Sequence, residues 1–496
     1  MLAMLSLALI AACICLILFR LLDCMRTSCL RTDKGNAKER RLIFFLSAIT
    51  IFLGSVPYLL LYAPGLNIFD THDQILQFFG YPSYIGDGSA LSDHHPVFLT
   101  ILYAAFMKLG LLLGSANTGQ MIYSLASMTA LSCAWAYALC TLYDEGLAKK
   151  VVLSIAAFVS VYPVLALYAF NMCKDISAAP FVLIFVAQMI RLHRTDGQAI
   201  RSKKYFVAMF FNSLMLMLMR KPSLYALAFA AVFSVIAYRR VRVRLGMCLF
   251  GAILLFHIGY SSLLLPALGV IPGETREMLS IPFQMTARYL NTYPNDVSPE
   301  ELKAVSRILD LEAVENYNPR LSDPIKDTSN PDMNGEDLIA YLCSFVKMGL
   351  RHPGVYIDAW LNMIYGYFYP SDSNTIFCLT LNSPDQGKLI LTQNEKLDAA
   401  RLELHNIFYF RLRRIPGVGC LFYVSTVSWA FLLLLCYAVT RGGLKESTPW
   451  MFFFGTLGIC LLSPKSGEIR YLMPILYALP VMLGVLLLPT KKGEYA

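Results

Sequence analysis

Apolar runs of about 17 to 24 residues follow one another along the chain, and they constrain its fold more than any other feature. A helix of about 20 apolar residues spans the ~30 Å hydrocarbon core of a bilayer and satisfies its own backbone hydrogen bonds there. Hydrophobic residues make up 57% of the 496 residues and charged residues only 15%, which excludes a soluble domain of ordinary composition. We predict an all-α polytopic membrane protein.

The apolar runs predict a bundle of about 11 transmembrane helices. They are expected at residues 3–22, 42–62, 119–142, 150–167, 177–192, 204–219, 223–238, 245–265, 416–440, 449–463 and 471–490. A further apolar stretch, 97–114, contains Lys108, and counting it as a span would invert every later loop. We therefore place it along the outer interface, starting at Pro96, where the missing N–H costs nothing.

Basic residues cluster beside the spans, at 26–41, 191–204, 239–244 and 441–445. Such clusters mark cytoplasmic loops, so the net charge of +9 needs no nucleic acid partner. The rule predicts a multi-pass protein of the plasma membrane, with membrane lipids as partners, a cytoplasmic C-terminus and an extracytoplasmic loop at 63–118.

Four parts are expected along the chain: an extra N-terminal helix with a basic loop (1–41), a transmembrane core (42–265), an extracytoplasmic or interfacial helical segment (266–414) and C-terminal transmembrane helices (415–496). In the third part, Ser298 to Glu301 form a capping box that predicts a helix reaching about Leu309. A helix lying on the membrane is expected over 336–368.

The loop after the second span holds the densest set of proton-handling groups: Asp70, His72, Asp73, Gln74, His94 and His95. Asp70 and Asp73 are one helical turn apart, and burial at an apolar interface raises the pKa of a carboxyl group, which makes it a better proton acceptor. We predict Asp70 and Asp73 as catalytic carboxylates and Gln74, His94 and His95 as substrate ligands. Helix capping, solvated loop acids or a metal site are the alternatives, although the spacing matches no standard metal site.

Cations also lie at the outer ends of spans, against the orientation bias elsewhere: Lys174, Arg220, Lys221, Lys465 and Arg470. A phosphate at the membrane surface would explain them, because Arg and Lys donate to anionic oxygens. The alternatives are lipid headgroup anchoring and pairing with Asp175 and Glu468. Asp175 itself is either a salt-bridge partner or a second acid of the site.

The predicted spans contain no acidic residue, whereas ion-coupled transporters need titratable groups at mid-bilayer. This argues against ion coupling. A passive flippase for lipid-linked saccharides and a non-catalytic envelope-assembly protein remain as alternatives to an enzyme.

The arrangement resembles the GT-C superfamily of membrane glycosyltransferases. Its members carry an Asp after an early span, a polar residue before Pro, and an acid in the next outer loop, here Asp70, His94-His95-Pro96 and Asp175. Arg470-Tyr471 followed by Pro474 resembles the R-Y-x-x-P opening of a late helix. Residues 281–289, 315–326 and 347–370 are similar to a family of uncharacterised bacterial membrane proteins assigned to that superfamily. His-His-Pro departs from the Lys-Pro-Pro of many members.

The resemblance implies transfer of a sugar from a polyprenyl-phosphate donor to an extracytoplasmic acceptor, usually with inversion. Asp70 would be the general base or would orient the acceptor, while Lys174, Arg220, Lys221 and Arg470 would hold the donor phosphate. Tyr471 would be a further substrate-binding residue. The mannosyltransferase-like branch requires no bound metal, whereas oligosaccharyltransferase-like members use one. We expect neither a metal nor another cofactor.

Overall fold

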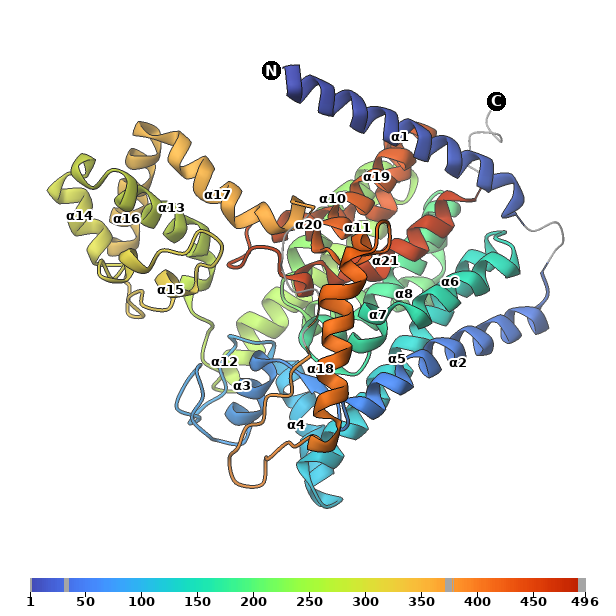
Figure 1. The fold of residues 1–496 in the computed structure, drawn as a ribbon, viewed down its shortest axis with the longest axis horizontal. Coiled ribbons are helices and arrows are strands. Elements are labelled where there is room, and N and C mark those ends of the chain that lie inside the picture. Colours follow the sequence, from blue (N-terminus) through green and yellow to red (C-terminus); the bar gives the residue numbers. More distant parts are fainter. Residues whose placement is uncertain (1, 31–34, 371–376, 378, 489–496) are drawn as a thin grey trace.

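The computed structural model describes residues 2–30, 35–370, 377 and 379–488, and nearly all of its regular structure is helical (Figure 1). Within these described residues, six helical segments are long and apolar enough to cross a membrane, and each coincides with a predicted span. They are α2 (Ala37–Leu61), α5 (Ala116–Asp144), α8 (Lys174–Arg194), the continuous run Arg239–Ala267 that contains α11 (Arg242–Leu254) and α12 (Leu265–Ala267), α19 (Val424–Gly442) and α21 (Ile469–Leu486). The all-α membrane fold is thus confirmed at this level.

The other five predicted spans fall on α1 and on shorter helices, so the count of eleven stays a prediction. These helices are α1 (Leu2–Ser28), α6 (Lys149–Val161), α7 (Pro163–Tyr168), α9 (Lys203–Met219), α10 (Ser223–Ala237) and α20 (Met451–Cys460). The predicted span 150–167 is broken between α6 and α7, because Pro163 has no N–H to continue the first helix and Tyr162 is extended. The stretch expected at the interface forms α4 (Val97–Leu112).

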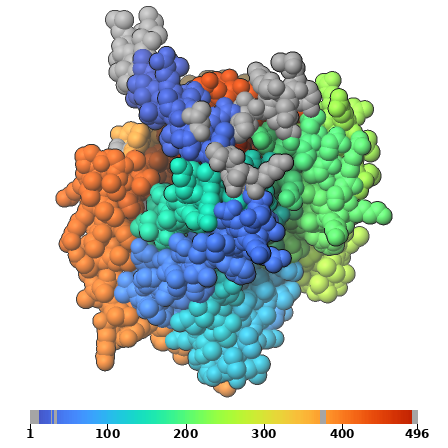
Figure 2. Space-filling model, turned by 90° about the vertical axis from the view of Figure 1, so that its right-hand side faces the viewer, coloured from blue at the N-terminus to red at the C-terminus, as the bar shows by residue number. Residues whose placement is uncertain are grey.

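The bundle is built around α5 and α8. Helix α5 packs against α2, α4 and α8, while α8 also contacts α9 and α21. Trp135 of α5 and Tyr477 of α21 are fully buried where these helices meet. Figure 2 shows α2 on one face of the molecule, beside the orange segment that contains α18 (Asp398–Asn406), and Arg401 of α18 donates to the Leu61 carbonyl at 2.9 Å.

One end of the bundle carries ion pairs between its helix termini. Arg40 of α2 lies 2.9 Å from Asp144 of α5, and Arg194 of α8 lies 3.1 Å from Glu145. Lys445 contacts Asp196, and Gly197 lies against Val241, so the four basic clusters predicted to share one side of the membrane lie at the same end of the bundle. At its opposite end, α2 leads into the loop that contains Asp70, and α8 begins at Lys174.

A small helical lobe lies beside the bundle (Figure 1). It comprises α13 (Ser280–Thr292), α14 (Pro299–Ser306), α15 (Asp323–Lys326), α16 (Gly335–Arg351) and α17 (Pro353–Phe368). Its own apolar core includes Phe283, Ile308 and Tyr341. The capping box at Ser298 is present, but α14 ends at Ser306, before the expected Leu309. The helix expected over 336–368 is two helices, because Pro353 cannot continue α16.

Backbone hydrogen bonds join a loop of the lobe, residues 320–322, to a loop of the bundle, residues 464–466. The Ser322 N–H donates to the Pro464 carbonyl at 2.8 Å, and the Ser466 N–H donates to the Arg320 carbonyl at 2.9 Å. These bonds hold the lobe against the residues that precede Arg470 at the start of α21.

Candidate functional site

A two-stranded parallel ladder, absent from the all-α prediction, determines the position of the site. Strand β1 (Leu66–Asn67) pairs with β2 (Asn171–Met172), with Leu66 opposite Asn171. Each strand is followed directly by a helix, α3 (Phe69–Phe78) after β1 and α8 after β2. Thr71 of α3 donates to the Met172 carbonyl at 2.5 Å, which fixes the two helix starts side by side.

The ladder brings together Asp70 in the first turn of α3 and Lys174 in the first turn of α8. The Lys174 Nζ lies 2.8 Å from the Asp70 Oδ2, and Arg470 Nη1 lies 3.5 Å from the same oxygen. Glu468 accepts from Lys465 at 2.8 Å and lies 3.3 Å from the Arg470 Nε. Three segments far apart in sequence thus meet at one carboxylate, whose side chain is 23% exposed.

The ionisation of Asp70 differs from the sequence-based expectation. Burial does favour the neutral acid, but the adjacent Lys174 and Arg470 outweigh it and hold the pKa of Asp70 well below its usual range. The expected rise in the pKa of Asp70 is therefore wrong. Asp70 is an ionised carboxylate at neutral pH, and its basicity depends on how strongly the two cations engage it.

Asp175 and Arg220 form a separate, fully buried pair. The Arg220 Nε lies 2.5 Å from the Asp175 Oδ1, and both side chains are 1% exposed. Arg220 also donates to the Tyr471 carbonyl at 3.4 Å, which ties α8 to α21. Because neither side chain reaches solvent, the geometry favours the salt-bridge alternative for Asp175, and Tyr471 contributes its backbone carbonyl to the same contact.

Lys221 contacts a different acid, Asp93, rather than Asp70. The two side chains are 2.8 Å apart, and the Lys221 ammonium also contacts the Asp93 carbonyl. Lys221 and Arg220, adjacent in sequence, therefore pair with acids on different segments, Asp93 in the loop before α4 and Asp175 in the first turn of α8. Asp93 is not among the site residues predicted from the sequence, although it directly precedes His94-His95-Pro96.

The remaining predicted residues lie along α3 and the loop before α4. Asp73 is 2% exposed and its Oδ1 lies 3.3 Å from the His72 Nδ1, so it does not join Asp70. Gln74 is fully buried and donates to Thr100 at 2.9 Å. His95 is 5% exposed, and burial lowers its pKa, so that it is neutral.

Several polar atoms in this region are buried without a hydrogen-bond partner among the described residues: Gln74 Oε1, Gln77 Oε1, His94 Nδ1 and His95 Nδ1. Buried polar groups are normally satisfied by protein, water or a ligand. The helix that carries Asp70 and the loop before α4 therefore both offer unsatisfied polar atoms.

The chain belongs to a family of unknown function, DUF6020, whose model matches residues 85–493. Lys174, Arg220 and Arg470 lie within the matched region, whereas Asp70 precedes it. No curated protein matches the chain significantly.

Removing Asp175 should destabilise the fold, because it leaves the Arg220 guanidinium buried without a counter-charge. We expect Asp175→Ala to lower the free energy of unfolding by about 3–5 kcal/mol, measured by thermal unfolding in detergent. The double variant Asp175→Ala/Arg220→Met removes both charges and should recover most of that loss. Equal stability of the wild type and Asp175→Ala would contradict the structural role of the pair.

The pH dependence of stability tests the ionisation of Asp70. A pKa lowered by folding contributes stability above the unfolded-state value of about 3.9, and this contribution is lost as the pH falls through the folded-state pKa. The stability difference between the wild type and Asp70→Asn should therefore stay constant from pH 5 to 8 and shrink below about pH 4. If the stability difference between the wild type and Asp70→Asn instead disappears between pH 5 and 7, the pKa of Asp70 is raised in the folded protein.

Proposed function

We propose that this protein is a GT-C type glycosyltransferase of the plasma membrane, which moves a sugar from a polyprenyl-phosphate donor to an extracytoplasmic acceptor. The observation that carries the proposal is the contact of one ionised carboxylate, Asp70, with the cations Lys174 and Arg470. Transfer from a phosphate donor needs a group that handles the acceptor proton and cations that hold the leaving phosphate.

The anionic donor would change the pairing of these groups. A phosphate between Lys174 and Arg470 competes with Asp70 for both cations, since each is a strong donor to anionic oxygens. The carboxylate that loses these contacts becomes more basic, because the nearby cations are what lowers its pKa. Donor binding would in this way convert Asp70 from an ion-pair partner into a proton acceptor.

In the proposed reaction, the acceptor oxygen attacks the anomeric carbon of the sugar and gives its proton to Asp70. The bond between that carbon and the phosphate oxygen breaks, and the phosphate leaves with the bonding electrons. Arg470 and Lys174 stabilise the charge that develops on it. Attack opposite to the leaving group inverts the anomeric centre.

An apolar cavity supports a lipid-linked substrate. Its volume is about 720 Å³, and α6, α19 and α21 supply most of its lining, which extends from Leu476 toward Lys150 and Leu487 at the end of the bundle remote from Arg470. Arg470 lies at the start of α21, about 9 Å along the helix axis from Leu476. A phosphate at Arg470 and an isoprenoid chain in the cavity would therefore contact the same helix.

The proposal predicts opposite effects of Asp70→Asn on binding and on catalysis. Lys174 and Arg470 would bind polyprenyl phosphate more tightly in this variant because the competing carboxylate is gone. Transfer should fall by at least about 100-fold, because a general base contributes roughly 10²–10⁴-fold. Binding is measured with polyprenyl phosphate and the protein in liposomes. Transfer is measured as the release of polyprenyl phosphate from a panel of polyprenyl-phosphate hexoses and pentoses.

Asp87→Asn is the matched control, since Asp87 lies between α3 and α4 and contacts Ser89. It should leave binding and release unchanged. Unchanged transfer in Asp70→Asn would overturn the role of Asp70. Lipid movement across the liposome membrane without sugar release would identify the flippase alternative instead.

The proposed orientation places the loop of Asp70 outside the cell and the C-terminus inside. In a variant whose exposed native cysteines are replaced by Ser, an impermeant thiol reagent added to whole cells should label Ser89→Cys and not Lys203→Cys. Both positions are exposed, so access depends on the side of the membrane. The reverse labelling pattern would contradict the orientation.

A further inference from the structure

The loop before α4 is joined by its backbone to the segment that enters the lobe. The Asp93 N–H donates to the Ile271 carbonyl at 2.7 Å, and the Ile271 N–H donates to the Leu91 carbonyl at 2.8 Å. A Cβ at Gly273 would lie 3.1 Å from the Asp93 carbonyl oxygen, so glycine permits this close approach. The pairing holds His94 beside the residues that follow Gly273.

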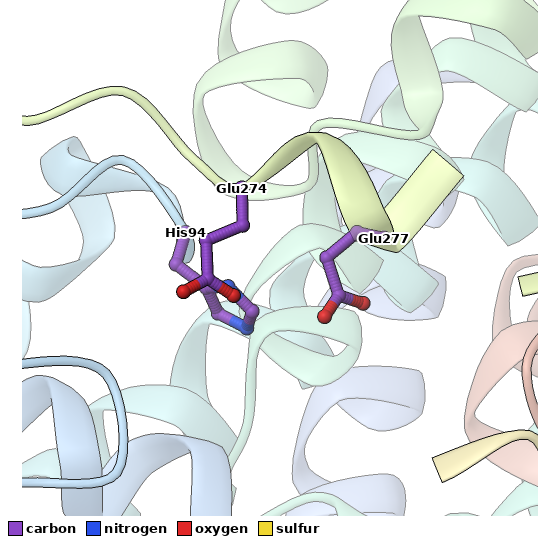
Figure 3. A group of neighbouring side chains, drawn as sticks. All are labelled: His94, Glu274 and Glu277. Atoms are coloured by element: carbon purple, nitrogen blue, oxygen red, sulfur yellow. The ribbon is translucent and has the colours of Figure 1, made fainter. Parts of the chain in front are cut away.

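Three ligand-type side chains converge there. One ring nitrogen of His94 and one carboxylate oxygen each of Glu274 and Glu277 all lie within 4.8 Å of one another. Figure 3 shows the imidazole below the segment that carries both glutamates, with the carboxylates directed toward it. Glu274 and Glu277 are three residues apart in a 3₁₀ turn region, so their side chains share one face.

The surroundings carry an excess of negative charge. Glu277 lies 3.1 Å from the Lys326 Nζ, but Asp323 also lies 3.1 Å from this ammonium and Asp327 3.6 Å from it. Arg276 contacts Glu274. Four carboxylates, those of Glu274, Glu277, Asp323 and Asp327, thus face the two cations Arg276 and Lys326, which gives a net charge of −2. If Glu277 turns to another cation, Lys326 keeps Asp323 and Asp327 as partners.

The imidazole supplies a second, independent observation. The Nδ1 of His94 is buried and has no hydrogen-bond partner among the described residues. Neither glutamate carboxylate satisfies this nitrogen in the present arrangement. A divalent cation bound through Nδ1 would satisfy this nitrogen and offset the net charge of −2.

In contrast to the expectation from the sequence, which gave His94 a role in substrate binding and the protein no metal, we propose that His94, Glu274 and Glu277 bind a Zn²⁺ ion. Imidazole together with carboxylate suits Zn²⁺, whereas Mg²⁺ and Ca²⁺ prefer oxygen ligands alone. The ion would join the loop before α4 to the entry of the lobe, and three protein ligands leave one position of a tetrahedral zinc open. None of the three ligands takes part in the ion pairs of Asp70, and the existence of this site does not depend on the proposed sugar transfer.

The test uses the full-length protein in detergent, stripped with a chelator and titrated with ZnCl₂. We expect one bound Zn²⁺ per chain by elemental analysis and a rise in the unfolding temperature with Zn²⁺ concentration, since a ligand that binds the folded state stabilises it. Glu274→Gln/Glu277→Gln should weaken Zn²⁺ binding by more than the roughly 10–100-fold that loss of an outer-shell partner costs. His94→Ala should do the same, because it removes the nitrogen ligand.

The matched control is Glu336→Gln, an exposed acid at the start of α16 in the lobe, which should bind Zn²⁺ like the wild type. MgCl₂ at the same concentrations should not raise the unfolding temperature. The proposal is overturned if the wild type binds no stoichiometric Zn²⁺, if the double glutamate variant binds it equally well, or if Mg²⁺ stabilises the protein equally. Zn²⁺ binding is measured without any sugar substrate. A negative result would therefore reject the metal site but would not test the proposed sugar transfer.

Discussion

The ladder between Leu66–Asn67 and Asn171–Met172 is the contact on which the arrangement of the site depends. It is only two residues long in each strand, but it sets the starting points of α3 and α8 next to each other. Asp70 and Lys174 are 104 positions apart and form an ion pair because both lie in the first turn after a paired strand. The side chain of Asn67 contacts the backbone of Asn382, so the segment after the lobe covers the ladder.

The electrostatics of the site connect its stability with its proposed chemistry. A carboxylate held by Lys174 and Arg470 stabilises the resting arrangement and is a weak base in it. The same cations suit a phosphate, so occupancy by an anionic donor and basicity of Asp70 are linked. The pair of Asp175 and Arg220 has a structural role instead. It is closed to solvent and joins α8 to α21.

The lobe is attached to the bundle on two sides of this site. Backbone hydrogen bonds connect it to the loop 463–468 before Arg470, and the segment that enters it pairs with residues 91–93 before α4. A metal at His94 would strengthen the second attachment. The lobe contributes none of the described contacts to the Asp70 carboxylate. Through these attachments it nevertheless helps to position the loops around Asp70.

The sequence by itself determined the helical membrane fold, the six long apolar spans and the residue types of the site, because hydrophobic length and charge distribution are local properties of the chain. It also located the capping box at Ser298, which depends on four consecutive residues. Only the tertiary structure decided which acid meets which cation, namely Asp70 with Lys174 and Arg470, Asp175 with Arg220, and Asp93 with Lys221. It likewise reversed the expected pKa shift of Asp70, because that pKa follows from the distances to cations more than 100 residues away, which spacing along the sequence does not contain.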